Sequence, residues 1–111
     1  MADTSEIVGV VDVQAAPGKA DAVIEAFAAC TRATHAEDGC IAYALHRDNA
    51  DPEHFMLVER WRSQADVDAH MNEPHTSALL AFAGAPGNLA QPPTLSFGSA
   101  LGLGDPVKGT L

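Results

Sequence analysis

Glu59 is the first residue of this sequence whose surroundings suggest acid–base chemistry. It lies in a segment where every second residue, Phe55, Leu57 and Trp61, is apolar. Successive side chains of a strand point to opposite faces, so we expect Glu59 among apolar neighbours on one face. Loss of hydration there raises the pKa of a carboxyl group and makes it a candidate general base. The alternative is a structural ion pair with an arginine or a histidine, and the sequence leaves both interpretations open.

Two histidines follow Glu59 closely in the sequence. His70 shares one face of a predicted helix with Val67 and Met71, so its ring should point inward, either as a packed core residue or as a proton acceptor. His75 comes directly after Pro74, which interrupts that helix. The spacing of these histidines is not the i, i+4 pair that brings two imidazoles to one metal, and no third ligand cluster stands nearby. We therefore expect no metal site.

Aromatic residues and cysteines complete the set of groups with chemical potential. Trp61, the single tryptophan, and Tyr43 each have two interpretations, as packing residues or as a wall for a flat aromatic substrate. Cys30 and Cys40 belong to no metal spacing and are expected to be free, packed thiols. A glycine-rich phosphate loop, a dinucleotide fingerprint and a nucleophile elbow are all missing from the sequence, so we expect no organic cofactor.

The elements that must position these side chains follow the order βαββαβ. Strands are expected at 7–13, 40–47, 54–61 and 94–101, where β-branched or alternating apolar residues dominate. A first helix should open at Pro17 and Gly18 and end near Glu37-Asp38-Gly39; a second should start at the N-cap Ser63 and continue beyond Pro74 as a piece over 75–83. The expected apolar stripe of the first helix is Ala20, Val23, Ile24, Phe27 and Thr31. This order predicts an α+β, ferredoxin-like fold with an antiparallel sheet and its helices on one face.

The central strands of that sheet are apolar on both sides. Val8 and Val10 alternate with the core residues of the first strand, and Met56 and Val58 do so in the third. A monomer would therefore expose a large apolar patch on the face without helices. We expect a homodimer in which a second copy covers this face.

Length and charge limit the classes of function. The 111 residues suit one domain, which we expect over 7–101, between a flexible N-terminus at 1–6 and a C-terminal tail at 102–111. A formal net charge of −9 disfavours binding to nucleic acid. No apolar stretch approaches the roughly 20 residues that cross a bilayer, and the acidic, polar start lacks the features of a secretory leader. We expect a cytoplasmic protein that does not bind membranes.

Four segments together resemble the antibiotic biosynthesis monooxygenase family of dimeric α+β barrels. They are the run at 55–61, the run at 63–70, Glu-Pro-His at 73–75, and the acidic-Gly-Cys stretch with its following tyrosine at 37–43. The resemblance covers about residues 7 to 100. It implies a homodimer with its sheets face to face and a pocket between sheet and helices in each subunit.

The resemblance also implies an activity. Members of the family include quinol and polyketide monooxygenases that use O₂ without metal or flavin, which requires a base, a dry pocket and correct orientation. By position, His70 is expected to be the base and Glu59 to orient it, or the reverse, with His75 as the third polar residue. The expected substrate contacts are Trp61, Tyr43, Phe55, Val11 and Phe82.

Haem is not expected, because Val11-Asp12 and Leu79-Leu80 stand where the haem-degrading branch has an asparagine and a ligating histidine. The expected function is therefore oxidation of a quinol or an aromatic polyketide-like substrate by O₂ in a cofactor-independent monooxygenase. A non-catalytic ligand-binding or stress-response dimer and a proton-shuttling isomerase remain as alternatives.

Overall fold

The two strands with apolar residues on both faces lie at the centre of the sheet. The computed structural model describes residues 5–111, so most of the expected flexible N-terminus lies outside the described residues. β1 (Ile7–Gln14) pairs antiparallel with β3 (Asp51–Trp61), and Val11 faces Leu57 across that pair. β2 (Cys40–Asp48) and β4 (Thr94–Gly98) complete the strand order β2-β3-β1-β4. The predicted ferredoxin-like βαββαβ fold is confirmed, with two helices in the second crossover.

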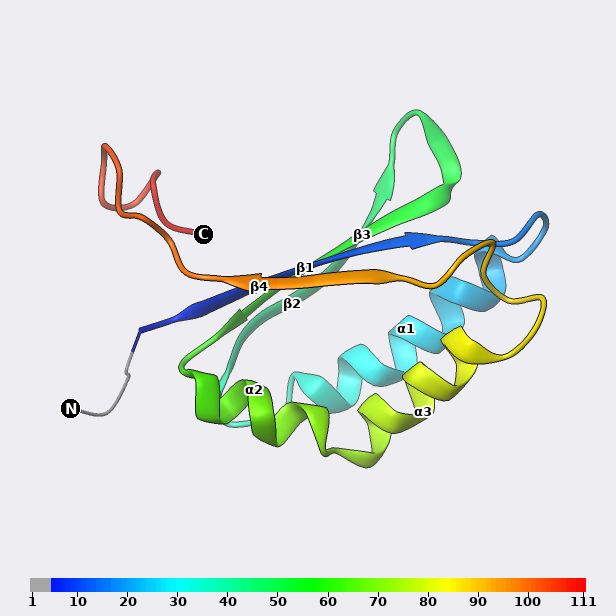
Figure 1. Ribbon diagram of the computed structural model, residues 1–111, viewed down its shortest axis with the longest axis horizontal. Helices are drawn as coiled ribbons and strands as arrows, with labels where there is room; N and C mark the ends of the chain where they lie inside the picture. The colour runs from blue at the N-terminus through cyan, green and yellow to red at the C-terminus, as the bar shows by residue number, and fades with distance from the viewer. Residues whose placement is uncertain (1–4) are drawn as a thin grey trace.

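The three helices found in residues 5–111 lie on one face of the sheet (Figure 1). They are α1 (Ala20–Thr34), α2 (Gln64–Met71) and α3 (Pro74–Gly84). The predicted N-cap is present, since the hydroxyl oxygen of Ser63 accepts a hydrogen bond from the backbone N–H of Asp66. Pro74 occupies the first turn of α3, where a missing N–H has no consequence. Pro74 thus starts a new helix instead of bending the old one.

Several boundaries differ from the sequence-based expectations. α1 ends at Thr34, ahead of the predicted end near residue 37, and turns over 35–39 connect it to β2. Its buried residues are Val23, Phe27, Cys30 and Thr34. Ile24 is exposed, because the sheet contacts a stripe rotated toward Cys30. β3 starts earlier than predicted, at Asp51, because the hairpin turn is short, and β4 ends at Gly98 instead of residue 101.

The face of the sheet opposite the helices carries an apolar centre with charged ends. Val10 and Met56 are exposed there, next to the half-buried Val8 and Val58. At one end, the ring of His54 lies between two carboxylates, with Nδ1 2.7 Å from Asp48 and Nε2 2.5 Å from Asp12. At the other end Arg60 pairs with Glu6. The prediction that β1 and β3 carry apolar residues on both faces is confirmed.

Gly9 allows a close approach between β1 and the edge strand β4. A Cβ atom at this position would lie 2.7 Å from the ring of Phe97 and 3.4 Å from the Cβ of Glu59. Because Gly9 has no side chain, the ring of Phe97 can lie over β1, close to Glu59 on β3.

The chain after β4 forms no helix or strand. Its apolar side chains are exposed, including Leu101 at 86% and Val107 at 82%. None of the described helices has the length and apolar character needed to span a membrane.

Candidate functional site

A cavity of about 80 Å³ lies between α3 and the helix-covered face of the sheet. It exists because α3 packs chiefly against α1, which leaves space above β1 and β4. Its walls are almost entirely apolar; the residues that form them include Val11, Val13, Leu57, Leu79, Phe82, Leu89 and Leu95. Four side chains bring polar atoms to the wall, namely Tyr43, Glu59, His70 and Thr76. An apolar cavity with a few converging polar groups is the usual form of a small-molecule site.

His70 is the central polar residue of this wall. The Ser63 cap sets the start of α2, and His70 in its last turn then faces inward, with 3% of its surface exposed. Its Nδ1 lies 2.8 Å from Oε2 of Glu37, in the turn between α1 and β2. A carboxylate only accepts, so Nδ1 is the nitrogen that carries the hydrogen. Nε2 remains as the nitrogen with a lone pair, and the hydroxyl of Thr76 lies 3.4 Å from both ring nitrogens.

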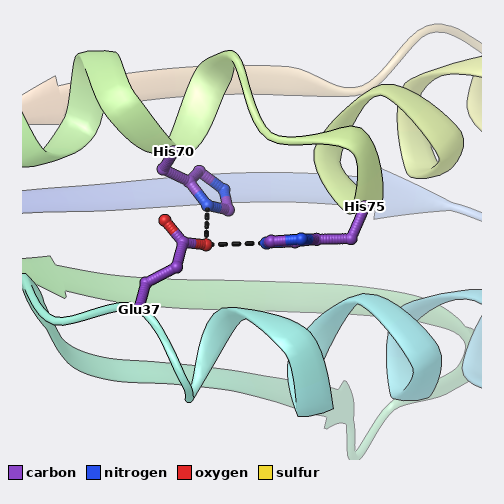
Figure 2. A group of neighbouring side chains, drawn as sticks. All are labelled: Glu37, His70 and His75. Carbon is purple, nitrogen blue, oxygen red and sulfur yellow. Dashed lines mark hydrogen bonds and ion pairs between the residues drawn. The ribbon is translucent and has the colours of Figure 1, made fainter.

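His75 contacts the same carboxylate oxygen (Figure 2). Its Nε2 lies 2.7 Å from Oε2 of Glu37, so one oxygen accepts from both imidazoles. Because α3 starts at Pro74, His75 lies in its first turn and points back toward the α1–β2 turn. The facing atoms of Glu37, His70 and His75 all lie within 4.8 Å of one another.

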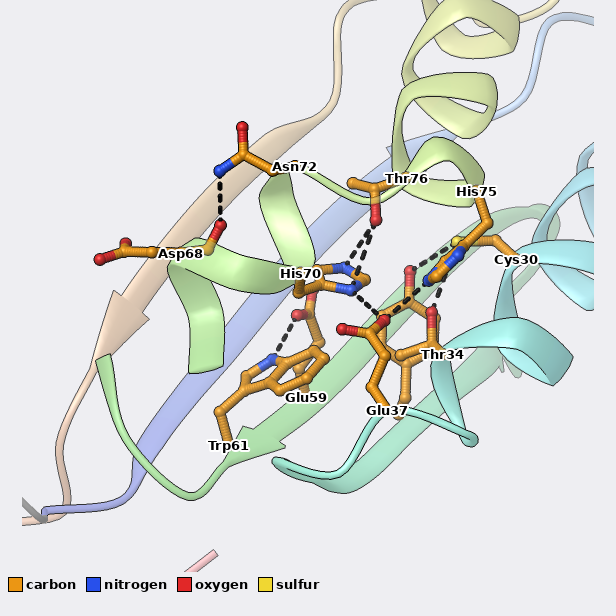
Figure 3. A network of polar contacts seen from close by, with 11 residues as sticks. Cys30, Thr34, Glu37, Glu59, Trp61, Asp68, His70, Asn72, His75 and Thr76 are labelled. Atoms are coloured by element: carbon orange, nitrogen blue, oxygen red, sulfur yellow. Dashed lines mark hydrogen bonds and ion pairs between the residues drawn. The ribbon is translucent and has the colours of Figure 1, made fainter. Parts of the chain in front are cut away.

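Glu59 and Trp61 form a separate pair on β3 (Figure 3). The indole Nε1 of Trp61 donates a hydrogen bond of 2.8 Å to Oε1 of Glu59. Burial raises the pKa of the Glu59 carboxyl above its ordinary value, although the bond from Trp61 and the nearby His70 act in the opposite direction. The Trp61 ring is completely buried and lies 4.6 Å, centroid to centroid, from the ring of His70. Trp61 therefore fixes both the carboxylate and one side of the imidazole.

The phenol of Tyr43 is held from the opposite side by α1. Its hydroxyl lies 3.6 Å from Sγ of Cys30, which in turn lies 3.7 Å from the hydroxyl of Thr34. Burial raises the pKa of the Tyr43 phenol, so this hydroxyl stays protonated. Burial also raises the pKa of the Cys40 thiol to about 11, helped by the charges of Glu37 and Glu59. A thiol with this pKa is a poor nucleophile at neutral pH.

The structure gathers most of the residues that the sequence singled out. Five of them line the cavity, namely Val11, Tyr43, Glu59, His70 and Phe82. Trp61 packs behind the polar wall. Neither His75 nor Glu37 lines the cavity, and Glu37 connects His75 to His70. Phe55 is fully buried under a different groove, between α1 and β2. The catalytic and substrate-binding roles expected for these residues remain predictions.

Glu37 and Thr76 are the polar residues around His70 that the sequence analysis missed. We expected Glu59 to orient His70, but the hydrogen bonds show Glu37 in this place, while Glu59 is bonded to Trp61. Glu37 was assigned only to the end of a helix, because nothing in its spacing from His70 indicates a contact. Its presence in the family-like segment at 37–43 was the one available signal.

Comparisons with known proteins found one matching family model and several similar structures. The family model described as antibiotic biosynthesis monooxygenase matches residues 7–81. A protein of known structure from Pseudomonas aeruginosa is 28% identical, with a TM-score of 0.77, and the match covers 91% of this chain and 99% of that one. One from Mycobacterium tuberculosis is 26% identical with a TM-score of 0.79, covering 87% of this chain and 96% of that one.

A curated relative from Escherichia coli carries the name "Probable quinol monooxygenase YgiN". It is 29% identical over 79 residues, which cover 62% of this chain and 76% of the relative. Two other curated relatives, from Synechocystis and Mycobacterium tuberculosis, are matched over only 44% and 41% of their own length. The chain therefore spans less than half of these two relatives.

Proposed function

Because the chain belongs to the antibiotic biosynthesis monooxygenase family, we propose that it oxidises a quinol with O₂ and needs no bound cofactor for this reaction. The observation that carries the proposal is a buried imidazole, His70, held by a carboxylate at the wall of an apolar cavity. The name of the Escherichia coli relative supports a quinol as the substrate class.

The size of the cavity favours a small quinol over a polycyclic polyketide. At about 10–15 Å³ of accessible volume for each water, a cavity of about 80 Å³ holds on the order of six waters. That space suits one substituted ring. The exposed side chains of Met71 and Leu80 also line the cavity, so an apolar substituent has a path toward solvent between α3 and β4.

The proposed reaction starts with proton transfer from a quinol hydroxyl to Nε2 of His70. The hydrogen bond from Nδ1 to Glu37 stabilises the imidazolium that forms, as a buried carboxylate does for the histidine of a catalytic triad. The second oxygen of Glu59, whose first accepts from Trp61, can accept a hydrogen bond from the substrate. Removal of the proton makes the ring electron-rich enough to reduce O₂ in a dry site.

The reaction balances without an external reductant. A quinol and O₂ give a hydroxyquinone and water, so one oxygen atom enters the ring and the other leaves as water. All electrons come from the substrate. His70 takes up the proton of one quinol hydroxyl, O₂ adds to a ring carbon, and the proton returns to the oxygen that leaves as water when the O–O bond breaks.

Oxygen uptake with a panel of hydroquinones tests this proposal. We expect enzyme-dependent O₂ consumption, with hydroxyquinone formed in equal amount, and faster turnover of one-ring than of polycyclic substrates. A protein that binds these quinols without consuming O₂ would be a ligand-binding protein, and one that rearranges them without O₂ would be an isomerase. Either result contradicts the proposal.

We further propose that the open sheet face forms a homodimer interface. Val10 and Met56 are exposed at its centre, 49% and 36% respectively, and the ionic groups lie at its ends. This apolar centre with a charged rim is the usual anatomy of a dimer interface. Sedimentation should show a dimer at micromolar concentration, and Val10→Asp should convert it to a monomer. A wild-type monomer under these conditions would refute the interface.

A further inference from the structure

We propose that Glu37, His70 and His75 bind one divalent transition-metal ion, such as Zn²⁺ or Co²⁺, and that this ion holds the protein in an inactive form. The three side chains come from the α1–β2 turn, α2 and α3, and their facing atoms lie within 4.8 Å of one another. Two imidazole nitrogens and one carboxylate oxygen form a donor set that suits Zn²⁺ and its neighbours in the first transition row. The binding claim stands apart from the proposed oxidation, whereas the inhibition depends on it.

The fold holds the side chains of Glu37, His70 and His75 in place. His70 has 3% of its side chain exposed, Glu37 13% and His75 18%, so all three are held within the fold. The rings of Trp61 and Tyr43 contact the His70 ring and limit its rotation. This packing keeps the His70 ring in the orientation that aims Nδ1 at Glu37.

A metal ion would replace the hydrogens that Glu37 shares with the two histidines, and the hydroxyl of Thr76, 3.4 Å from Nδ1 of His70, is the further polar neighbour there among the described residues. Among the described residues, the ion pairs of Glu37 are with the two histidines, and no lysine or arginine neutralises it. One carboxylate oxygen accepts from both rings at 2.7 and 2.8 Å, so both nitrogens already point to one place. The net charge of −9 also attracts cations to the molecule.

The histidine on the open sheet face shows why proximity alone is insufficient. His54 also has two carboxylate neighbours, but each contacts a different nitrogen of the ring, Asp48 at Nδ1 and Asp12 at Nε2. The two nitrogens of one imidazole point in divergent directions, so these three groups cannot converge on one ion. His54 therefore provides a matched control, a histidine between carboxylates without a metal site.

Inhibition follows from the tautomer that a metal ion would impose on His70. A neutral imidazole has one nitrogen with a lone pair and one with a hydrogen. In the metal-free protein the hydrogen is on Nδ1 and faces Glu37, which leaves Nε2 as proton acceptor. A metal ion at Nδ1 uses the lone pair there and places the hydrogen on Nε2. The same residue then cannot take a proton from the substrate.

A Co²⁺ titration followed by visible absorption tests the site directly. The full-length protein is treated with EDTA, dialysed and titrated, and calorimetry with Zn²⁺ gives the stoichiometry. We expect one equivalent of metal per chain and Co²⁺ absorption bands of nitrogen and oxygen coordination. Glu37→Gln and His75→Gln each remove a proposed direct ligand and should weaken binding by more than the roughly ten-fold that loss of an outer-shell partner costs, whereas His54→Gln should bind as the wild type does. Circular dichroism melting confirms that each variant is folded.

Two results would overturn the site. One is the lack of a saturable spectrum up to millimolar Co²⁺; the other is binding that stays unchanged in folded Glu37→Gln and His75→Gln. In the inhibition assay, one equivalent of Zn²⁺ should stop quinol oxidation and EDTA should restore it. Full activity of the metal-saturated protein would refute inhibition. If the protein oxidises no quinol at all, the proposed function fails, but the absorption titration still decides whether the metal site exists.

Discussion

Replacement of His70 by asparagine separates proton transfer from the structural role of this residue. The asparagine amide nitrogen lies close to where Nδ1 lies in histidine, so it can still donate to Oε2 of Glu37. It has no basic nitrogen in place of Nε2. The variant should therefore keep the hydrogen-bonded cluster and lose the proton acceptor.

The rate and the stability should change by different amounts. Loss of a general base lowers the rate about 10²-fold or more, which corresponds to about 2.7 kcal/mol of activation free energy. The free energy of unfolding of His70→Asn should fall by about 1–2 kcal/mol. The variant loses the packing of the imidazole on Trp61, whose ring centroid lies 4.6 Å away, but keeps the hydrogen bond to Glu37. His70→Ala should lose more, about 2–4 kcal/mol, since it also leaves a cavity and removes a hydrogen bond to a charged group.

Both quantities must be measured on the same sample. Initial rates of O₂ uptake are divided by the folded fraction, which a urea melt followed by circular dichroism supplies. The exposed His46, replaced by asparagine, is the control for the general effect of losing an imidazole. If His70→Asn turns over at the wild-type rate per folded molecule, His70 is a packed core residue and the assignment as base is wrong.

Three further predictions concern residues around the site and across the sheet. Glu59→Gln should raise the urea midpoint at pH 8 and have less effect near pH 5, because burial raises the pKa of Glu59 and the wild type loses stability as pH rises through it; an equal effect at both pH values would contradict this. His54→Gln should destabilise more at pH 6 than at pH 9, because the hydrogen bond to Asp48 and the second carboxylate raise the pKa of His54, and that stabilisation disappears as pH rises through it; urea melts at the two values decide. Gly9→Ala should lower Tm by more than Gly98→Ala, because only the first would press on the ring of the β4 phenylalanine; equal melting curves would show that this ring moves freely.

Local patterns in the sequence determined most of the fold. The alternation in β3 placed Glu59 and Trp61 on the helix-covered face, and both are buried there. The Ser63 cap and the break at Pro74 also predicted where α2 starts and where the next helix begins. Strand alternation, the helix cap and the proline break each depend on residues close together in the sequence. The geometry of a single strand or helix is therefore enough to predict them. The same patterns failed for the buried stripe of α1, because which residues of a helix face the sheet depends on its packing angle.

Only the tertiary structure decided which polar groups meet. His70 and His75 have a spacing that argues against a shared partner on one helix, yet the two helices that carry them aim both rings at Glu37. Glu37 is far from both in sequence, and the contact exists because the fold brings the α1–β2 turn close to the end of α2 and the start of α3. Spacing rules describe neighbours on one element. A site assembled from three elements depends on the packing angles between those elements. These angles are set by all the core side chains together, so no local pattern in the sequence predicts them.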